Sequence, residues 1–351
     1  MIRTEREYRP FTTQDETAFT ETIRTQEESS YYFQAPTNTL YLTEATDGIH
    51  ELSLLNRGIS GTAYPTMEEA AKIYGTALSR MEAYDYSQVL NAGFRVADGN
   101  SKILIRYEEI AAVHSSKYVP MPIPDLFQIT KDELEQKFGE VEFRSGYNST
   151  SYTECFFDLV EQEDELNEKY QKATEGFHKN YGFSFMPVIR FASSDTAIAQ
   201  ASLTPLLAVG NRYIRFVPSI KTKHDRSGRS YGTAAFQESV KQCFAKFDDT
   251  VETVERLGKI TLRHPANAVI GLCKRYHIPK SHAEQVWEDI KRFEEASVEV
   301  SAYDLYVALS LQVANSKENL SRYTALTLEE NLAKALTGDF KSLDSAITPK
   351  W

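Results

Sequence analysis

Two adjoining stretches decide the fold. Residues 187–217 read PVIRFASSDTAIAQASLTPLLAVGNRYIRFV, and residues 232–258 read GTAAFQESVKQCFAKFDDTVETVERLG. In the first, runs of β-branched and aromatic residues alternate with turn signals at Asp195 and at Gly210-Asn211, which predicts two or three short strands of one meander. The second predicts a helix of roughly 27 residues and about 40 Å, which is long enough to cross a whole sheet.

The predicted helix carries one apolar face. Its apolar side chains recur at steps of three and four residues, which places them on the same side of the helix. These side chains are Phe236, Val240, Cys243, Phe244, Phe247, Val251, Val254 and Leu257. Gly258 follows at the position where a left-handed C-terminal cap is expected.

The whole chain predicts an α+β fold, in which an antiparallel strand meander is covered by the long helix and followed by a helical C-terminal region. We expect a polar N-terminal arm at 1–30, an α+β core domain at 31–260 and the helical region at 261–351. Asp98-Gly99, between apolar runs at 94–96 and 102–106, predicts a β-hairpin. Near the end, Thr327 and Glu330 are spaced as a capping box that starts a helix.

Composition predicts a soluble cytoplasmic protein. Of 351 residues, 41% are hydrophobic and 25% are charged, and the 20 Tyr and 19 Phe are more aromatic residues than a disordered chain carries. No apolar run approaches the ~20 residues of a membrane span, and the N-terminus lacks the apolar core of a signal peptide. Cys155, Cys243 and Cys273 are odd in number and far apart, which indicates buried free thiols in a reducing compartment.

Positive charge concentrates between Arg212 and Tyr231, although the chain as a whole carries a net charge of −11. This segment contains six Lys or Arg residues and one acidic residue, Asp225, and aromatic residues are interleaved with them. Fixed cations bind phosphates and aromatic rings stack on bases, so this pattern predicts binding of a nucleic-acid single strand. The alternatives are a solvated hairpin tip or a surface for a protein partner. The predicted contacts are Arg212, Tyr213, Arg215, Lys221, Lys223, His224, Arg226, Arg229 and Tyr231.

Other candidate sites are weaker. Asp195 could bind a metal or act as a base, but an aspartate that stabilises its own turn explains it as well. Asp125, Glu135 and Lys137 match the Asp…Glu-x-Lys order of metal-dependent nucleases, yet the latter two fall in a helical pattern where a strand is required. Nucleotide-loop, hydrolase-elbow and Cys-x-x-Cys motifs are missing from the sequence. We therefore predict no catalytic residue, no metal and no cofactor.

Several short motifs occur in an order that resembles a known family. VHSSKYVP at 113–120 is followed by SSDTA at 193–197, LTP at 203–205, GNR at 210–212, IKTKH at 220–224, AYDLY at 302–306 and LEENL at 328–332. Together they resemble the phage- and plasmid-related proteins called domain of unknown function 932, over about residues 60–340. The chain departs from the family at Thr196, where the family often has Gly after the Asp, and at Gly210, where the family often has Cys before the Asn. The resemblance implies a mobile-element context and no established reaction.

These observations lead to one expected function and two alternatives. We expect a non-enzymatic, phage- or plasmid-encoded accessory protein of DNA metabolism that binds single-stranded DNA through the basic hairpin loop. A meander followed by one long helix also resembles the core of recombination proteins that anneal strands, which implies a homo-oligomer. One alternative is an acidic anti-defence protein that binds a host protein through the acidic run at 161–165. The other is a metal-dependent hydrolase.

Overall fold

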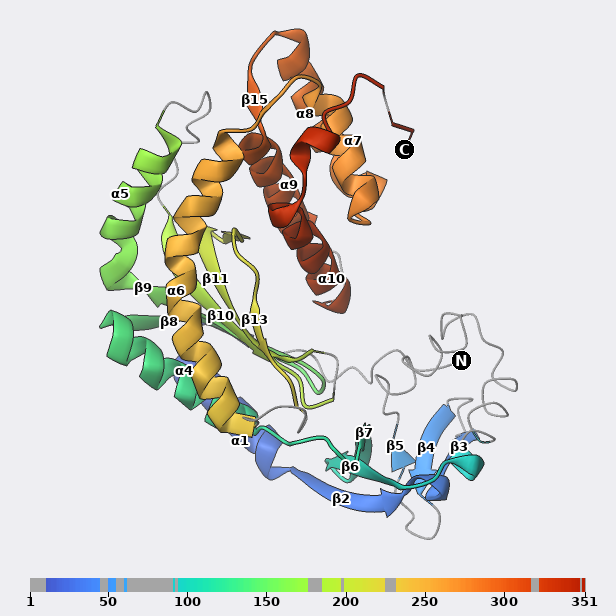
Figure 1. The fold of residues 1–351 in the computed structure, drawn as a ribbon. Coiled ribbons are helices and arrows are strands. Elements are labelled where there is room, and N and C mark those ends of the chain that lie inside the picture. The colour runs from blue at the N-terminus through green and yellow to red at the C-terminus, as the bar shows by residue number, and fades with distance from the viewer. Residues whose placement is uncertain are drawn as a thin grey trace.

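The computed structural model describes residues 11–44, 50–54, 60–61, 91, 94–175, 185–196, 199–224, 232–316, 322–347 and 349–350. Within these residues the predicted α+β fold is confirmed. Helices cover one face of a seven-stranded antiparallel sheet, and further helices form the C-terminal end of the chain (Figure 1).

The main sheet contains the predicted meander. Its strands run in the order β1-β8-β9-β10-β11-β12, and β13 pairs with β11 as well. At the centre, Arg190 of β10 lies opposite Phe156 of β9 on one side and Thr204 of β11 on the other. The strands are β1 (Phe11–Thr13), β8 (Val141–Asn148), β9 (Thr153–Leu159), β10 (Met186–Ser193), β11 (Ala201–Val209), β12 (Arg212–Ile214) and β13 (Ile220–Thr222).

Successive side chains of a strand point to opposite faces of the sheet. Phe157, Ile189 and Phe191 point to the face that the helices cover, and they belong to one large apolar core. Phe156 and Val188 point to the other face, in a second, smaller cluster. The covering helices are α1 (Glu16–Glu28), α4 (Ile123–Phe138), α5 (Glu163–Thr174) and α6 (Gly232–Gly258).

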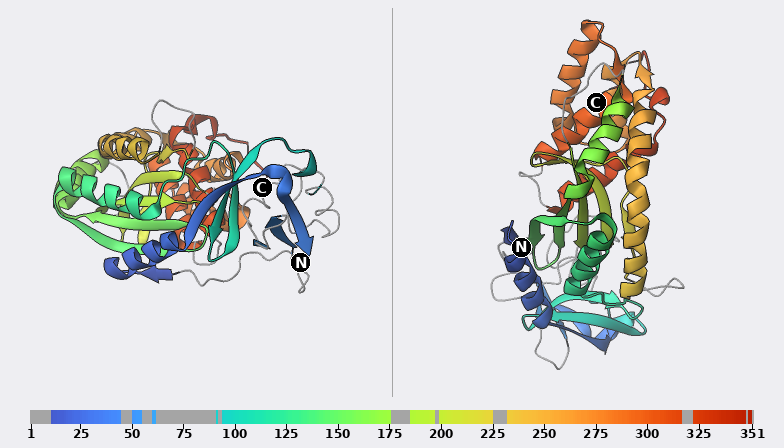
Figure 2. Two further views of the ribbon diagram at one scale, coloured as in Figure 1. Left: turned by 90° about the horizontal axis from the view of Figure 1, so that it is seen from below. Right: turned by 90° about the vertical axis from the view of Figure 1, so that its left-hand side faces the viewer.

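The predicted long helix is confirmed as α6, a helix of 27 residues. Phe236, Val240 and Cys243 of its apolar face are fully buried. Figure 2 shows α6 running from the C-terminal helices to the far end of the main sheet. The left-handed cap expected at Gly258 is wrong, because Gly258 is the last helical residue and is not among the glycines with positive φ. Positive φ occurs instead at the first helical residue, Gly232, at +69°.

Residues 11–28 belong to the sheet and its cover, although the sequence suggests a polar arm. β1 pairs with β8. Asp15 then caps α1 by accepting hydrogen bonds from the backbone N–H groups of Thr17 at 2.9 Å and Ala18 at 3.2 Å. Phe19 and Ile23 of α1 are buried in the large core. Isolated apolar residues in a polar stretch are therefore enough to attach this segment.

A smaller sheet, β2-β6-β7, packs against the end of the main sheet, and its pairing corrects one prediction. The expected hairpin around Asp98-Gly99 is wrong, because residues 94–96 are helical and β6 pairs with β2 and β7. Gly99 still provides a turn, with φ of +100°. The strands are β2 (Ser30–Pro36), β6 (Asn100–Arg106) and β7 (Glu109–Ser115), and a third sheet contains β3 (Leu40–Glu44), β4 (His50–Leu54) and β5 (Ser60–Gly61).

The C-terminal region is helical, as predicted. Its elements are β14 (Thr261–Leu262), α7 (Pro265–Arg275), α8 (Lys280–Glu295), β15 (Val300–Ser301), α9 (Ala302–Ser316) and α10 (Arg322–Ala333). The short 3-10 helices are η1 (Thr37–Thr39), η3 (Val160–Gln162), η5 (Lys334–Thr337) and η6 (Phe340–Ser342). The capping box expected at Thr327 and Glu330 is wrong, because α10 begins at Arg322 and contains both residues. Among the described helices, none has the length and apolar composition needed to cross a bilayer.

Candidate functional site

A buried polar cluster lies where the small sheet meets the strand ends of the main sheet. His114 is in β7, Tyr118 follows that strand, and His224 follows β13. The three rings are stacked, with ring centres 3.8 Å apart between His114 and Tyr118 and 5.3 Å apart between Tyr118 and His224. Asp195 follows β10, and Arg106 ends β6. We call these five residues the His–Tyr cluster.

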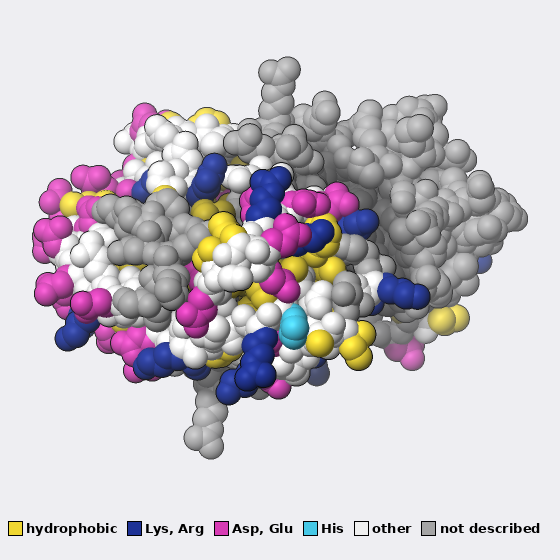
Figure 3. Space-filling view, turned by 90° about the horizontal axis from the view of Figure 1, so that it is seen from above, with side chains coloured by type: hydrophobic (Ala, Val, Ile, Leu, Met, Phe, Trp, Pro, Cys, Tyr) yellow, Lys and Arg dark blue, Asp and Glu magenta, His cyan; other side chains and the backbone are white. Residues whose placement is uncertain are grey.

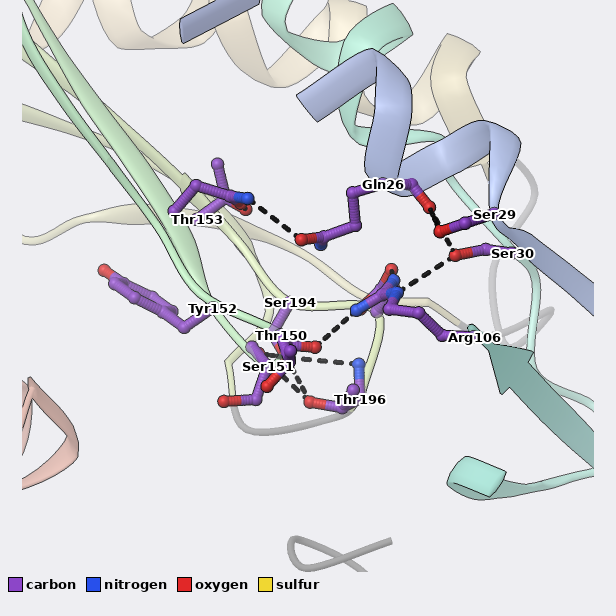
Figure 4. A network of polar contacts seen from close by, with 12 residues as sticks. Gln26, Ser29, Ser30, Arg106, Thr150, Ser151, Tyr152, Thr153, Ser194 and Thr196 are labelled. Carbon is purple, nitrogen blue, oxygen red and sulfur yellow. Dashed lines mark hydrogen bonds and ion pairs between the residues drawn. The ribbon is translucent and has the colours of Figure 1, made fainter. Parts of the chain in front are cut away.

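Arg106 joins the two sheets. Arg106 is only 3% exposed, and it forms an ion pair with Asp195, which is 5% exposed. The same guanidinium donates to the carbonyl oxygen of Thr150 and, at 3.0 Å, to Ser30 Oγ (Figure 4). Removing either charge would leave the other buried without its partner, which is costly. The pair therefore fixes the position of Asp195 relative to β6.

Hydroxyl groups hold the turn that carries Asp195. Ser194 Oγ donates to the backbone carbonyl of Ser151 at 2.6 Å, and Thr196 Oγ1 donates to the same carbonyl at 3.0 Å (Figure 4). Thr196 N also donates to Ser194 Oγ at 3.2 Å. These bonds connect the turn after β10 to the turn before β9, so Asp195 is held from both sides.

Several polar atoms of the cluster lack partners. Within the described residues, His114 Nε2, Asp195 Oδ1 and both ring nitrogens of His224 have no hydrogen bond of ordinary geometry. Buried polar groups are nearly always hydrogen-bonded. Buried polar atoms without a partner therefore indicate either a position where a ligand binds or a residue whose protonation changes when the protein folds.

Burial sets the protonation of the two imidazoles. Desolvation lowers the pKa of His114 to about 4, although the Asp195 backbone and carboxylate act in the opposite direction. Desolvation likewise lowers the pKa of His224 to about 4, against the opposing effect of Asp195. Both rings are therefore neutral at pH 7. Burial also raises the pKa of Tyr118, and Asp195 raises it further, so its hydroxyl stays protonated.

The structure corrects the interpretation of Asp195. It does lie at a turn, but its carboxylate pairs with Arg106 instead of stabilising its own backbone. Among the described residues, no group of three His, Cys, Asp or Glu side chains is arranged to hold a metal ion. The cluster therefore offers neutral imidazoles, a phenol and one carboxylate oxygen, which suit hydrogen bonding.

The predicted basic loop is not one surface patch. Arg212 pairs with Val209 at one end of β11, whereas Thr222 pairs with Ala201 at the other end. Eight residues of extended strand separate these ends by about 27 Å. The expectation of a single cationic loop is therefore wrong for Arg212, which lies far from Lys223.

Three of the predicted contact residues already interact with other residues of the protein. Arg215, 7% exposed, forms an ion pair with Glu330 at 2.8 Å, and Lys221 binds the same carboxylate at 3.0 Å. Burial raises the pKa of Glu330, but the two cations outweigh that effect and lower it to about 2. Tyr213 stacks on Phe156 with ring centres 4.4 Å apart. None of these three groups presents a free charge or ring face as predicted.

The remaining predicted contacts divide into two groups. Arg212 and Lys223 are exposed and form no ion pair with another described residue. His224 is half-buried in the His–Tyr cluster, and its carbonyl accepts a hydrogen bond from Val119 N at 2.8 Å. Arg226, Arg229 and Tyr231 lie outside the described residues. Figure 3 shows acidic and basic side chains interspersed over the described part of one face, without a continuous basic patch.

Comparison with known proteins adds no relative: no family model, no curated protein and no solved structure matches this chain. The family resemblance stays a prediction. His114 and Tyr118, Asp195 and His224 come from three of the stretches on which it rests, and they lie together in the His–Tyr cluster. Sequence reasoning missed Arg106, because no local pattern indicates that a strand-end arginine meets Asp195, 89 residues later.

Proposed function

We propose that this chain binds single-stranded nucleic acid through the segment 221–231, at the junction between β13 and α6. The ligand class is the one that the composition of this segment favours. Lys223, Arg226 and Arg229 supply positive charge against Asp225, and Tyr231 supplies a ring on which a base can stack.

One observation carries this function. His224 is fixed by its stack on Tyr118 and by the hydrogen bond from Val119, while the neighbouring Lys223 is exposed. The cationic segment therefore begins at a rigid point of the fold. Fixing one end of a binding segment reduces the entropy that is lost when it binds, and this raises its affinity. The meander followed by α6 adds a fold-level analogy with strand-annealing proteins.

Fewer cationic side chains are available for binding than the sequence suggests. Arg215 and Lys221 share the Glu330 carboxylate, and Arg212 lies at the opposite end of β11. The net charge of −11 repels a polyanion at longer range. We therefore expect modest affinity that depends steeply on salt.

Fluorescence polarisation with a labelled oligothymidylate tests this function. Combined replacement of Lys223, Arg226 and Arg229 by Ala removes three phosphate contacts. The slope of log affinity against log salt should then become shallower by about 2, because each single-strand contact contributes about 0.7. Lys221→Ala alone should weaken binding less than Lys223→Ala, because Lys221 already has a carboxylate partner.

A matched control separates a site from an effect of total charge. Lys259, Lys280 and Lys291 are exposed, and each pairs with a glutamate one helical turn away. Their combined replacement by Ala changes the net charge by the same amount and should leave binding almost unchanged. Equal loss in both triple variants would refute the site. Wild-type binding that is absent, or insensitive to salt, would refute the function.

A further inference from the structure

A second candidate site lies in the C-terminal helices. A cavity of about 250 Å³ lies between α8 and α9, beside β15. Its apolar lining includes Val286, Ile290, Phe293 and Leu311. Most pockets that hold drug-sized ligands are larger, about 300–1,000 Å³, so this cavity suits a small molecule or a single long side chain.

One carboxylate at the cavity forms hydrogen bonds to described residues through only one of its two oxygens. Asp304 is 4% exposed and lies in the first turn of α9. Its Oδ2 accepts hydrogen bonds from Ser301 N at 2.9 Å and Ser301 Oγ at 2.7 Å, while Asp304 N donates to Ser301 Oγ at 3.2 Å. This reciprocal pattern is a helix capping box. Asp304 Oδ1 has no partner among the described residues, although Asp304 lines the cavity.

Among the described residues, the charged groups that line this cavity are all acidic. Asp289 and Glu299 line it together with Asp304, and no described Lys, Arg or His is among the lining residues. The other two have partners: Asp289 pairs with the exposed Arg292 at 3.7 Å, and Glu299 accepts from Thr261 Oγ1 at 2.9 Å. Asp304 Oδ1 is therefore the acceptor that a ligand would meet.

These features define the ligand chemistry. A buried carboxylate oxygen needs a donor, and a charged donor forms the stronger bond. Since the described residues hold no three-ligand metal group, the matching cation is an organic one. The apolar lining suits a hydrocarbon stem. We propose that this cavity binds an ammonium or guanidinium group on a short apolar stem, with Asp304 Oδ1 as its acceptor.

Calorimetric titration with four probes tests the site. n-Pentylamine and agmatine carry the two cationic groups as free small molecules, and n-pentanol carries the same kind of stem without charge. A capped Gly-Lys-Gly peptide carries the ammonium on a side chain. We expect saturable binding by at least one cation and none by pentanol. Binding by the free amines assigns a small-molecule ligand, and binding by the peptide alone assigns a side chain of a partner.

Asp304→Asn separates ligand binding from helix capping. An asparagine oxygen can still accept the two Ser301 bonds, so α9 keeps its cap, but an amide N–H₂ group then replaces the free acceptor. Affinity for the cation should fall about tenfold to a hundredfold, because a charge-assisted hydrogen bond is lost. Asp15→Asn, at the cap of α1, is the matched control and should change nothing.

A second variant tests the cavity without changing Asp304. Ala308 lies on α9 and lines the same cavity, so Ala308→Leu should fill it and abolish binding while Asp304 stays in place. Circular dichroism melting shows whether each variant is folded. The site is refuted if no cation binds saturably, or if folded Asp304→Asn and Ala308→Leu proteins bind as the wild type does.

Discussion

The stacked histidines make the stability of the fold sensitive to mild acid. His114 and His224 have pKa values of about 4 in the folded protein, against 6.5 in an exposed chain. Between these values the unfolded chain binds protons that the folded chain does not. Stability is therefore full above about pH 6.5 and is lost as the pH falls towards 4.

The size of this effect follows from the same values. From pH 7 to pH 5, each histidine should remove about 2 kcal/mol from the free energy of unfolding, or about 4 kcal/mol for the pair. His224→Phe keeps a ring against Tyr118 but cannot be protonated, and it removes two unpartnered nitrogens. This variant should be at least as stable as the wild type at pH 7, and it should lose only about half as much stability on acidification.

Urea denaturation at a series of pH values measures these free energies directly. The double variant His114→Phe and His224→Phe should show the flattest dependence, because neither ring can then be protonated. If His224→Phe retains the full wild-type loss of stability between pH 7 and pH 5, the buried neutral state inferred for His224 is wrong.

Two further predictions concern the packing around the cluster and the sheet. Arg106→Met should lower the free energy of unfolding, measured in urea, by about 3–5 kcal/mol because it leaves Asp195 buried without its cation. Adding Asp195→Asn should restore part of that loss. Equal stability of the single and double variants would contradict the pairing. Gly146→Ala should cost about 1–3 kcal/mol, because a Cβ there would overlap the ring of Phe19, and Phe19→Leu in the same chain should relieve the overlap. No rescue in the double variant would show that Phe19 does not limit the space at Gly146.

The parts of the fold that could be predicted have local signals. The face of α6 repeats every three or four residues, so eight apolar positions in one stretch are sufficient to define it. The turn between β11 and β12 needs a residue with positive φ, and Gly210 provides it at +57°. In both cases the residues that decide the structure are near neighbours in sequence.

The predictions that were wrong concern residues whose partners are distant in sequence. β6 pairs with β2, about 70 residues earlier, so the Asp98-Gly99 signal could not reveal its true neighbours. Glu330 has the spacing of a helix cap, but it binds Arg215, 115 residues away. The His–Tyr cluster draws its residues from four separate segments. Charge counted along the sequence therefore overestimated the exposed basic surface, since it ignored the carboxylates that fold against it.

Two buried arginines, Arg190 of β10 and Arg215 just after β12, have a consequence for protein synthesis. Arg190 pairs with Glu329 at 2.6 Å and Arg215 pairs with Glu330, and both glutamates belong to the last long helix. The sequence separations are 139 and 115 residues, so a ribosome translates most of the C-terminal half before either charge is neutralised. The nascent sheet must keep these side chains hydrated until then. A truncated mRNA that ends before α10 would yield a chain in which both arginines lack their glutamate partners. We expect such a chain to stay partly folded and to be degraded by quality-control proteases.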